Sequence, residues 1–132
     1  MKLPIFTGSG VALVTPFTST GVDFPALKKL VDFQINNGTD AIIVCGTTGE
    51  AATMTQAERI QTIETVVEHV NGRAPVIAGS GANNTETAVQ ASREIAKIGV
   101  DALLVVTPYY NKATPRGLIR HYTAVADAVR KP

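Results

Sequence analysis

The chain has 132 residues, a length that suits one domain with its own hydrophobic core and leaves little room for a second. Hydrophobic residues make up 45% of the sequence and charged residues 17%, a balance that argues against an intrinsically disordered chain. The net charge is +1 and no cluster of lysine and arginine stands out, which argues against nucleic acid or an anionic membrane as a partner. We therefore expect a small molecule or another copy of the protein as the partner.

Other classes of protein are disfavoured by what the chain lacks. No apolar run approaches the roughly 18 residues of a membrane span, and the N-terminus has no signal-peptide pattern, so a cytoplasmic location is expected. Cys45 is the only cysteine and cannot form an internal disulfide. His69 and His121 are the only imidazoles, too few for a spaced zinc-ligand set. We expect neither a metal site nor a cofactor.

The first half of the chain predicts two strand–helix units. An apolar run at 11–14 predicts a strand, and the helix after it is expected to begin after Asp23, with Pro25 in its first turn, and to end at Gly38. A second apolar run at 41–44 predicts the next strand. The capping box at 55–58 then opens a helix that ends at 71–72.

The second half repeats the pattern. A strand is predicted at 75–78, and the helix after it is expected to be capped by Asn84 or Thr85 and to end at Gly99. Another strand is predicted at 102–106, and the helix after it is expected to start at 114–115 and to end at Pro132. All four strands are continuously apolar, which indicates a parallel sheet covered on both faces. The expected apolar stripes of the helices are Leu27, Leu30, Val31 and Ile35; Ile60, Ile63, Val67 and Val70; Ala88, Ala91, Ile95 and Ile98; and Leu118, Tyr122, Val125 and Val129.

An internal repeat supports four equivalent units. The segment 38–44 (GTDAIIV) recurs as 99–105 (GVDALLV), in each case a helix end running into a strand. A closed parallel barrel needs eight strands, so four βα units form either a doubly wound sheet or half of a TIM (β/α)8 barrel. The nearest nucleotide-binding pattern, at 79–84, lacks its third glycine, and we interpret it as a tight turn. We predict a single (βα)4 half-barrel domain over residues 1–132.

The loops after the strands form the working face of such folds, and here they are rich in hydroxyl groups. Glycines flank Thr47 and Thr48, so the backbone could approach a carboxylate or phosphate closely; an ordinary capping turn remains the alternative reading. Glu50 would repel an anion, and we expect it to pin the loop instead. Tyr109 and Tyr110 could be a subunit contact or a proton carrier assisted by Thr47, although packing is the commoner fate of such pairs.

The sequence motifs of these loops resemble those of one protein family. The segments VTPF (14–17), GTTGE (46–50), AGSGAN (78–83) and TPYYNK (107–112) occur in the order and spacing of dihydrodipicolinate synthases, and the resemblance runs from about Thr7 to the last residue. N-acetylneuraminate lyases share the fold and a similar GTTGE-type loop, but Thr47 and the full TPYYNK run favour the synthases.

The resemblance implies a homotetrameric TIM-barrel lyase of lysine (diaminopimelate) biosynthesis, which condenses pyruvate with aspartate semialdehyde through a lysine Schiff base. It implies that Thr47 and Thr48 bind the pyruvate carboxylate, and that Thr47 joins a proton relay with Tyr110 of a neighbouring subunit. Tyr109 would line the subunit interface. Asn83 falls where some members bind the inhibitor lysine, but Gln56, Arg59 and Thr87 depart from the residues expected around it.

The same resemblance places the Schiff-base lysine, with a companion tyrosine and arginine, on strands five and six, beyond Pro132. The lysines of this chain fall on predicted helices, at the chain ends or on a loop: Lys2, Lys28, Lys29, Lys97, Lys112 and Lys131. The isolated chain is therefore predicted to be inactive. Two other hypotheses stay open: a non-catalytic half-barrel that self-associates through its edges, and a phosphate- or nucleotide-binding half-barrel, the weaker because barrel phosphate sites follow strands seven and eight.

Overall fold

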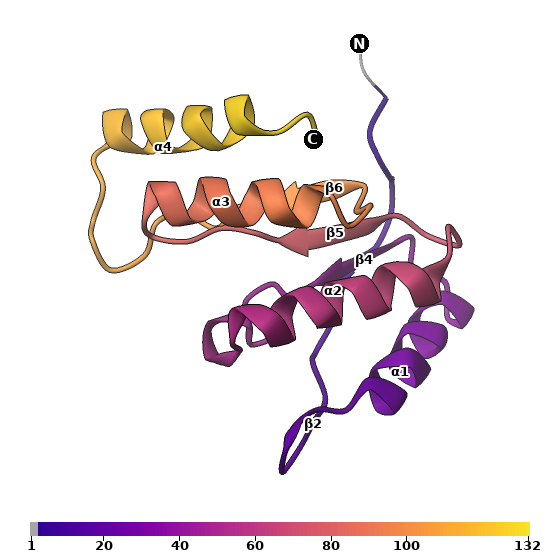
Figure 1. The fold of residues 1–132 in the computed structure, drawn as a ribbon. Coiled ribbons are helices and arrows are strands. Elements are labelled where there is room, and N and C mark those ends of the chain that lie inside the picture. Colours follow the sequence, from indigo (N-terminus) through magenta and orange to yellow (C-terminus); the bar gives the residue numbers. More distant parts are fainter. Residues whose placement is uncertain (1–2) are drawn as a thin grey trace.

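A computed structural model describes residues 3–132. Its main sheet has four parallel strands in the order β1 (Gly10–Ala12), β4 (Ala41–Val44), β5 (Val76–Gly79) and β6 (Ala102–Leu104). Each strand is followed by a helix, namely α1 (Phe24–Asn36), α2 (Gln56–Val70), α3 (Thr85–Ala96) and α4 (Pro115–Ala128) (Figure 1). The four predicted βα units are confirmed, although β1 and β6 each end two residues before the expected position.

Side-chain caps start all four helices. The Asp23 carboxylate accepts from the Ala26 N–H at 2.9 Å, and Thr55 forms the predicted capping box with Glu58. Asn84, rather than Thr85, caps α3, and Thr114 caps α4. These caps satisfy N–H groups that the first helical turn leaves without partners, so each helix begins where its cap stands.

The hydrophobic core lies between the helices and one face of the sheet. Alternate strand residues point into it, including Leu13, Ile42, Val44, Val76 and Ala78. The helices pack in two pairs, α1 with α2 and α3 with α4 (Figure 1). Their buried apolar residues include Leu27, Val31, Ile63, Val66, Val70, Ala88, Val89, Ala91, Ile95 and Val125. Most of these belong to the predicted stripes.

The opposite face of the sheet is open, which corrects the expectation of a sheet covered on both faces. Near the amino ends of the strands, Phe6 packs with Ala41, Ile77 and Ala102 in a small second cluster. Towards the carboxyl ends no such cover exists in residues 3–132: Val14 is 51% exposed, Leu104 44% and Val106 39%. The strands are apolar on both faces, yet the helices of this chain cover only one.

The sequence repeat is also a structural repeat. Before β4, the Asp40 N–H donates to the Ser9 carbonyl at 2.8 Å while the Asp40 carboxylate accepts from the Ser9 N–H at 2.8 Å. Before β6, Asp101 makes the same two bonds with Val76, both at 2.8 Å. Each aspartate thereby ties the start of its own strand to the start of a neighbouring strand in the main sheet, β1 for Asp40 and β5 for Asp101. The half barrel is thus built from two equivalent pairs of βα units, which agrees with the pairing of the helices.

Two small elements were not predicted. The segment after β1 forms a hairpin of β2 (Phe17–Thr18) and β3 (Gly21–Val22), where a loop was expected, and a 3-10 turn, Ala51–Thr53, precedes α2. Two-residue strands carry too little periodicity to be recognised from sequence. At the other end, the Leu103 N–H on the outer edge of β6 donates to the Pro132 carbonyl at 3.0 Å.

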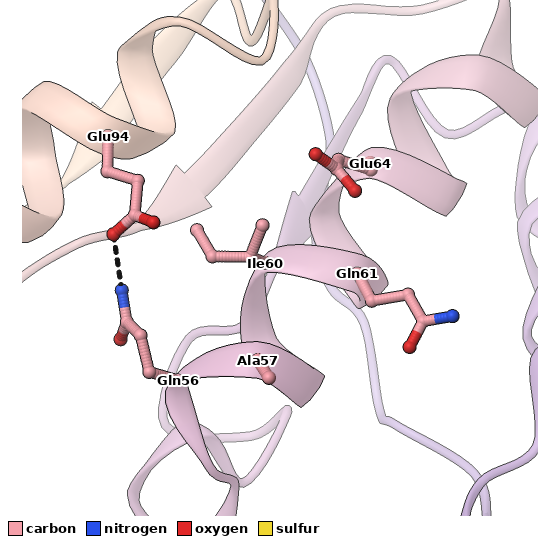
Figure 2. A pocket seen from close by; sticks show the side chains of 6 residues that line it. All are labelled: Gln56, Ala57, Ile60, Gln61, Glu64 and Glu94. Carbon is pink, nitrogen blue, oxygen red and sulfur yellow. Dashed lines mark hydrogen bonds between the residues drawn. The ribbon is translucent and has the colours of Figure 1, made fainter.

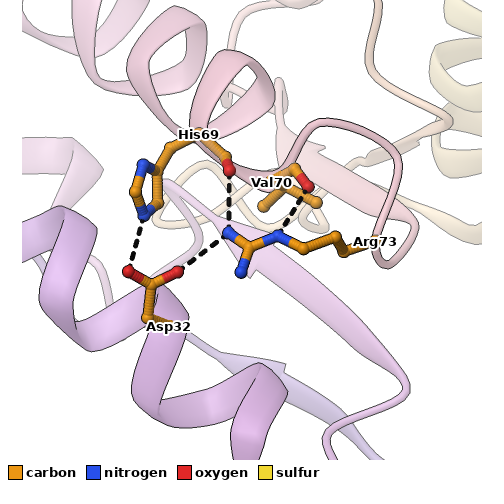
Figure 3. A network of polar contacts seen from close by, with 4 residues as sticks. All are labelled: Asp32, His69, Val70 and Arg73. Atoms are coloured by element: carbon orange, nitrogen blue, oxygen red, sulfur yellow. Dashed lines mark hydrogen bonds and ion pairs between the residues drawn. The ribbon is translucent and has the colours of Figure 1, made fainter.

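A charged network joins α1 to the end of α2 (Figure 3). The Asp32 carboxylate lies 2.9 Å from His69 Nε2 and accepts from Arg73 Nη2 at 2.8 Å. The Arg73 guanidinium also donates to the carbonyls of His69 and Val70 at the helix end, at 2.8 and 3.0 Å, and the Arg73 backbone N–H donates to the Val70 carbonyl as well, at 3.0 Å. Contacts with His69 and then Arg73 hold the pKa of Asp32 below its ordinary value.

Substituting Asp32→Asn should therefore lower stability in a pH-dependent way. A carboxyl whose pKa is lower in the folded state contributes stability above its unfolded pKa of about 3.9, and this contribution is lost as the pH falls through the folded pKa. We expect the variant to melt roughly 2 °C below the parent at pH 6, since exposed ion pairs contribute little, and the difference to shrink as the pH falls below about 3.9. Thermal melts across this pH range measure the effect, with Asp127→Asn on the exposed side of α4 as the control. The same change in melting temperature with pH in both variants would refute a stabilising role of the network.

Candidate active site

The loops after the four strands meet at the carboxyl ends of the sheet. The loop after β1 is joined to the loop after β4 by Thr15, whose buried hydroxyl donates to the Gly49 carbonyl at 2.7 Å. Gly49 itself lies so close to the Leu13 carbonyl that an added Cβ would come within 3.0 Å of that oxygen. The glycine is needed for this approach, and the loop 46–50 is consequently held against the end of β1.

Thr47 and Thr48 stand on a turn within this loop, and both side chains are exposed. The Glu50 N–H donates to the Thr47 carbonyl at 3.0 Å and closes the turn. Glu50 adopts a left-handed conformation, φ 56°, and its carbonyl accepts from the Thr53 hydroxyl at 3.0 Å. Glu50 thus takes part in the loop through its backbone, and a structural role of its carboxylate stays a prediction. The two threonine hydroxyls face solvent on a fixed turn, the arrangement that an anion-binding cradle requires.

The glycines at 79 and 81 serve close packing. A Cβ on Gly79 would lie 2.0 Å from the Cys45 carbonyl oxygen, and one on Gly81 would lie 2.4 Å from the Val106 backbone nitrogen. Between them, Ser80 is fully buried and accepts a hydrogen bond from the Ser92 hydroxyl of α3 at 2.9 Å. This geometry agrees with the interpretation of 79–84 as a tight turn, because the glycines bring neighbouring strand ends together.

A half-buried arginine lies beside the carboxyl ends of β4 and β5. Arg59 of α2 donates through Nη2 to the Gly79 carbonyl, and its own carbonyl lies 3.9 Å from the Cys45 thiol. Burial lowers the pKa of Arg59, while the nearby Cys45 and Tyr109 raise it. Burial raises the pKa of the Cys45 thiol to about 11, although Arg59 lowers it. Cys45 is therefore a neutral packing residue near pH 7 and a poor nucleophile.

Tyr109 and Tyr110 project outward from the loop after β6. Tyr109 is 53% exposed and Tyr110 96%, so neither ring is packed against residues 3–132, and the roles as subunit contact or proton carrier stay predictions. Tyr110 does not reach Thr47 within one chain, because a side chain so exposed has almost no neighbours. The start of the loop is fixed by Thr107, whose hydroxyl lies 2.8 Å from the Tyr122 hydroxyl of α4.

The remaining polar candidates lie away from these loops or are unsuited to nucleophilic attack. Lys28, Lys29, Lys97 and Lys112 are exposed on helices, a helix end and a loop, Lys131 follows α4, and Lys2 lies outside the described residues. His69 joins the network with Asp32, and His121 is buried with Nδ1 2.9 Å from the Thr85 hydroxyl. Within residues 3–132, no three His, Cys, Asp or Glu side chains are grouped to hold a metal ion, and no helix is long and apolar enough to cross a membrane.

A groove between α2 and α3 lies on the outer surface (Figure 2). The Gln56 amide bridges it by donating to the Glu94 carboxylate at 2.7 Å, and Glu64 adds a second negative charge. Acidic groups disfavour a carboxylate or phosphate ligand. The strand-end loops, which carry hydroxyls and no such acidic pair, are the better site for an anion even though they form only one wall.

Comparison with known proteins identifies the family. The model of the dihydrodipicolinate synthetase family matches residues 5–132. The chain belongs to this family. Over 128 residues it is 56% identical to 4-hydroxy-tetrahydrodipicolinate synthase of Geobacter metallireducens, covering 97% of this chain and 44% of that protein.

Solved dihydrodipicolinate synthases have the same fold over this length. The enzyme from Aquifex aeolicus superposes with a TM-score of 0.93 at 50% identity, over 96% of this chain and 43% of that one. The chloride-inhibited enzyme from Acinetobacter baumannii, complexed with pyruvate, gives 0.92 at 48% identity, over 95% and 43%. The chain thus spans less than half the length of these relatives, and its fold is half of a TIM barrel, as predicted.

Several residues of this dihydrodipicolinate synthetase half-barrel were not singled out as site residues by the sequence. Thr15 pins the threonine turn, Arg59 donates to the Gly79 carbonyl at the end of β5, and Asn111 donates to the Asn83 carbonyl at 3.1 Å. Each of them acts on a residue at least 20 positions away, so local patterns contain no signal for it. Asn83 does lie beside the tyrosine loop, where its amide donates to the Tyr109 carbonyl at 3.3 Å.

Proposed function

We propose that this chain is the amino-terminal half of a 4-hydroxy-tetrahydrodipicolinate synthase, a lyase that condenses pyruvate with aspartate semialdehyde in lysine biosynthesis in the cytoplasm. The observation that carries the proposal is the exposed Thr47–Thr48 turn, held by Thr15 at the carboxyl ends of a half-barrel of this family. Support for pyruvate as the ligand comes from the Acinetobacter baumannii relative, which was solved with pyruvate bound.

In this proposal the threonine turn binds the pyruvate carboxylate. Hydroxyl groups and backbone N–H groups of Thr47 and Thr48 donate to the carboxylate oxygens, and charge-assisted hydrogen bonds of this kind are about twice as strong as neutral ones. The neighbouring Arg59 adds a positive charge behind the loops without entering the site. Because the turn is pinned before the ligand arrives, little ordering cost opposes binding.

Tyr110 is proposed to act in a second subunit. Its exposed phenol would enter the site of a neighbouring chain in a homo-oligomer and, with Thr47, carry a proton; Tyr109 would line the same interface. The exposure of both rings supports this role, since large aromatic side chains are seldom left in water without a partner. Asn83 is a candidate contact for a regulatory ligand in the same region.

The Schiff-base lysine is proposed to come from the part of the enzyme that this chain does not contain. An imine-forming lysine must be neutral in a desolvated pocket, and the lysines in residues 3–132 are on helices, loops or the last residues. Incubation of the chain with pyruvate and borohydride, followed by mass spectrometry, should give no adduct. A stable reduced adduct on any lysine would refute the absence of the nucleophile.

The open face of the sheet favours a second candidate function, a half-barrel that self-associates. Val14, Leu104 and Val106 are partly exposed there, and β1 has an unpaired outer edge. Two copies could pair β1 of each with β6 of the other and cover both apolar faces, provided that the Leu103 N–H on the edge of β6 releases the Pro132 carbonyl. Sedimentation should then show a dimer at micromolar concentration. A well-folded monomer would argue against this candidate and leave the enzyme-half proposal intact.

A further inference from the structure

Tyr110 occupies an unusual backbone conformation. Its φ is 71°, and the Asn111 N–H donates back to the Tyr109 carbonyl at 2.9 Å, which closes a three-residue γ-turn centred on Tyr110. The form of this turn with positive φ is rare and strained, and a bulky residue avoids it unless surrounding contacts hold it there. Something other than local preference must therefore maintain the turn.

Two asparagine side chains supply that restraint. The Asn83 amide donates to the Tyr109 carbonyl at 3.3 Å, and the Asn111 amide donates to the Asn83 carbonyl at 3.1 Å. The loop after β5 and the loop after β6 are thus joined by two hydrogen bonds, one donated from each loop. The Tyr109 carbonyl receives two donors, one from within the γ-turn and one from the loop after β5, so opening the turn would break both sets of bonds.

The loop that provides Asn83 is itself rigid. Asn83 directly precedes Asn84, the cap of α3, whose carboxamide oxygen accepts from the Thr87 N–H at 2.9 Å. On its other side, Gly81 is pressed against the Val106 backbone, where there is no room for a side chain. Asn83 is therefore fixed at both ends, and its bonds transfer this rigidity to the tyrosine loop.

We propose that Asn83 and Asn111 are positioning residues that form one clasp, which holds Tyr110 in the strained turn and presents its phenol outward to a neighbouring subunit. The inference rests on the proposed function of Tyr110 and adds the device that orients it. A side chain that is 96% exposed and on a free loop would lose much conformational entropy on entering a partner's site. The clasp removes the backbone part of that cost in advance.

NMR on the chain itself tests the clasp. At positive φ the amide and α protons of one residue lie close together, so Tyr110 should show a strong intraresidue HN–Hα NOE. Asn83→Ala and Asn111→Ala should weaken it, and Asn83→Asp, which keeps the shape and loses the donor, should act like Asn83→Ala. Chymotrypsin should cleave after Tyr110 about fivefold faster in Asn83→Ala, the factor expected for loss of one net hydrogen bond.

Asn37→Ala is the matched control, because the Asn37 amide also donates to a backbone carbonyl, that of Phe33 at 2.7 Å, far from the loop. It should leave both the NOE and the cleavage rate unchanged. The double variant at 83 and 111 should be no worse than the single variants, since one clasp can be opened only once. An unchanged NOE and cleavage rate in both single variants, or additive effects, would overturn the clasp. These readings involve no catalysis, so a failure of Tyr110 as a proton carrier would be detected separately, in the activity of a complete enzyme.

Discussion

Mixing this chain with a polypeptide that carries the remaining four βα units of a related synthase is expected to produce synthase activity that neither part shows alone. The half barrel offers the complement an open apolar face and two sheet edges, and burial of that face is the driving force for association. The complement would contribute the Schiff-base lysine, and this chain the threonine turn. Activity is measured from the consumption of pyruvate and aspartate semialdehyde by the mixture and by each part.

Thr47→Val should then lower the activity of the mixture about 100-fold, because under the proposed function it removes both a carboxylate donor and a proton-relay hydroxyl. Thr65→Val is the matched control: Thr65 is a partly exposed threonine of α2 whose hydroxyl donates to the Gln61 carbonyl at 2.8 Å, away from the loops. It should retain full activity. If the parts form a complex by sedimentation and remain inactive, or if the two variants are equally active, the role assigned to Thr47 is wrong.

The sequence predicts those features of the fold that depend on residues close together in the chain, such as the helix starts and the strand positions. The helix starts at Asp23, Thr55 and Thr114 were predicted because a cap and its N–H partner lie three residues apart. The strand positions followed from short apolar runs, and the fold class from their alternation with helices and from the repeat at 38–44 and 99–105. Asp40 and Asp101 occupy the same position in the repeat, and each carboxylate accepts from a backbone N–H at the start of the neighbouring strand. The sequence repeat is therefore also a repeat of the structure.

What the sequence could not predict depends on distant residues. Apolar strands indicate the potential for burial on both faces, but not which chain supplies the cover, so the open face was missed. Val66 and His121 are buried although neither belongs to a predicted stripe, because helix pairing sets the exact buried face. The exposure of Tyr110 likewise follows from a clasp between two loops, and no spacing along the chain reveals it.

Replacing Gly79 by alanine is expected to destabilise the fold strongly. The new Cβ would lie 2.0 Å from the Cys45 carbonyl oxygen, 2.8 Å from the Cys45 carbonyl carbon and 3.2 Å from the Gly46 nitrogen. All three are backbone atoms at the end of β4, so no side-chain rotation can relieve the contact, and β4 and β5 would have to separate. Overpacking that shifts backbone costs about 3 kcal/mol, which corresponds to a fall in Tm of roughly 10 °C.

Gly46→Ala provides the comparison, because a Cβ there meets only the end of the Leu104 side chain, at 3.6 Å, an ordinary contact. It should change Tm by no more than about 2 °C. Thermal melts and urea titrations of both variants measure the difference. Since Gly79 and Cys45 lie directly behind the Thr47–Thr48 turn, Gly79→Ala should also displace the turn, visible as NMR shift changes at residues 46–50. Equal stability of the two alanine variants would mean that the strand ends are not packed as closely as this fold requires, and the threonine turn would lose its support.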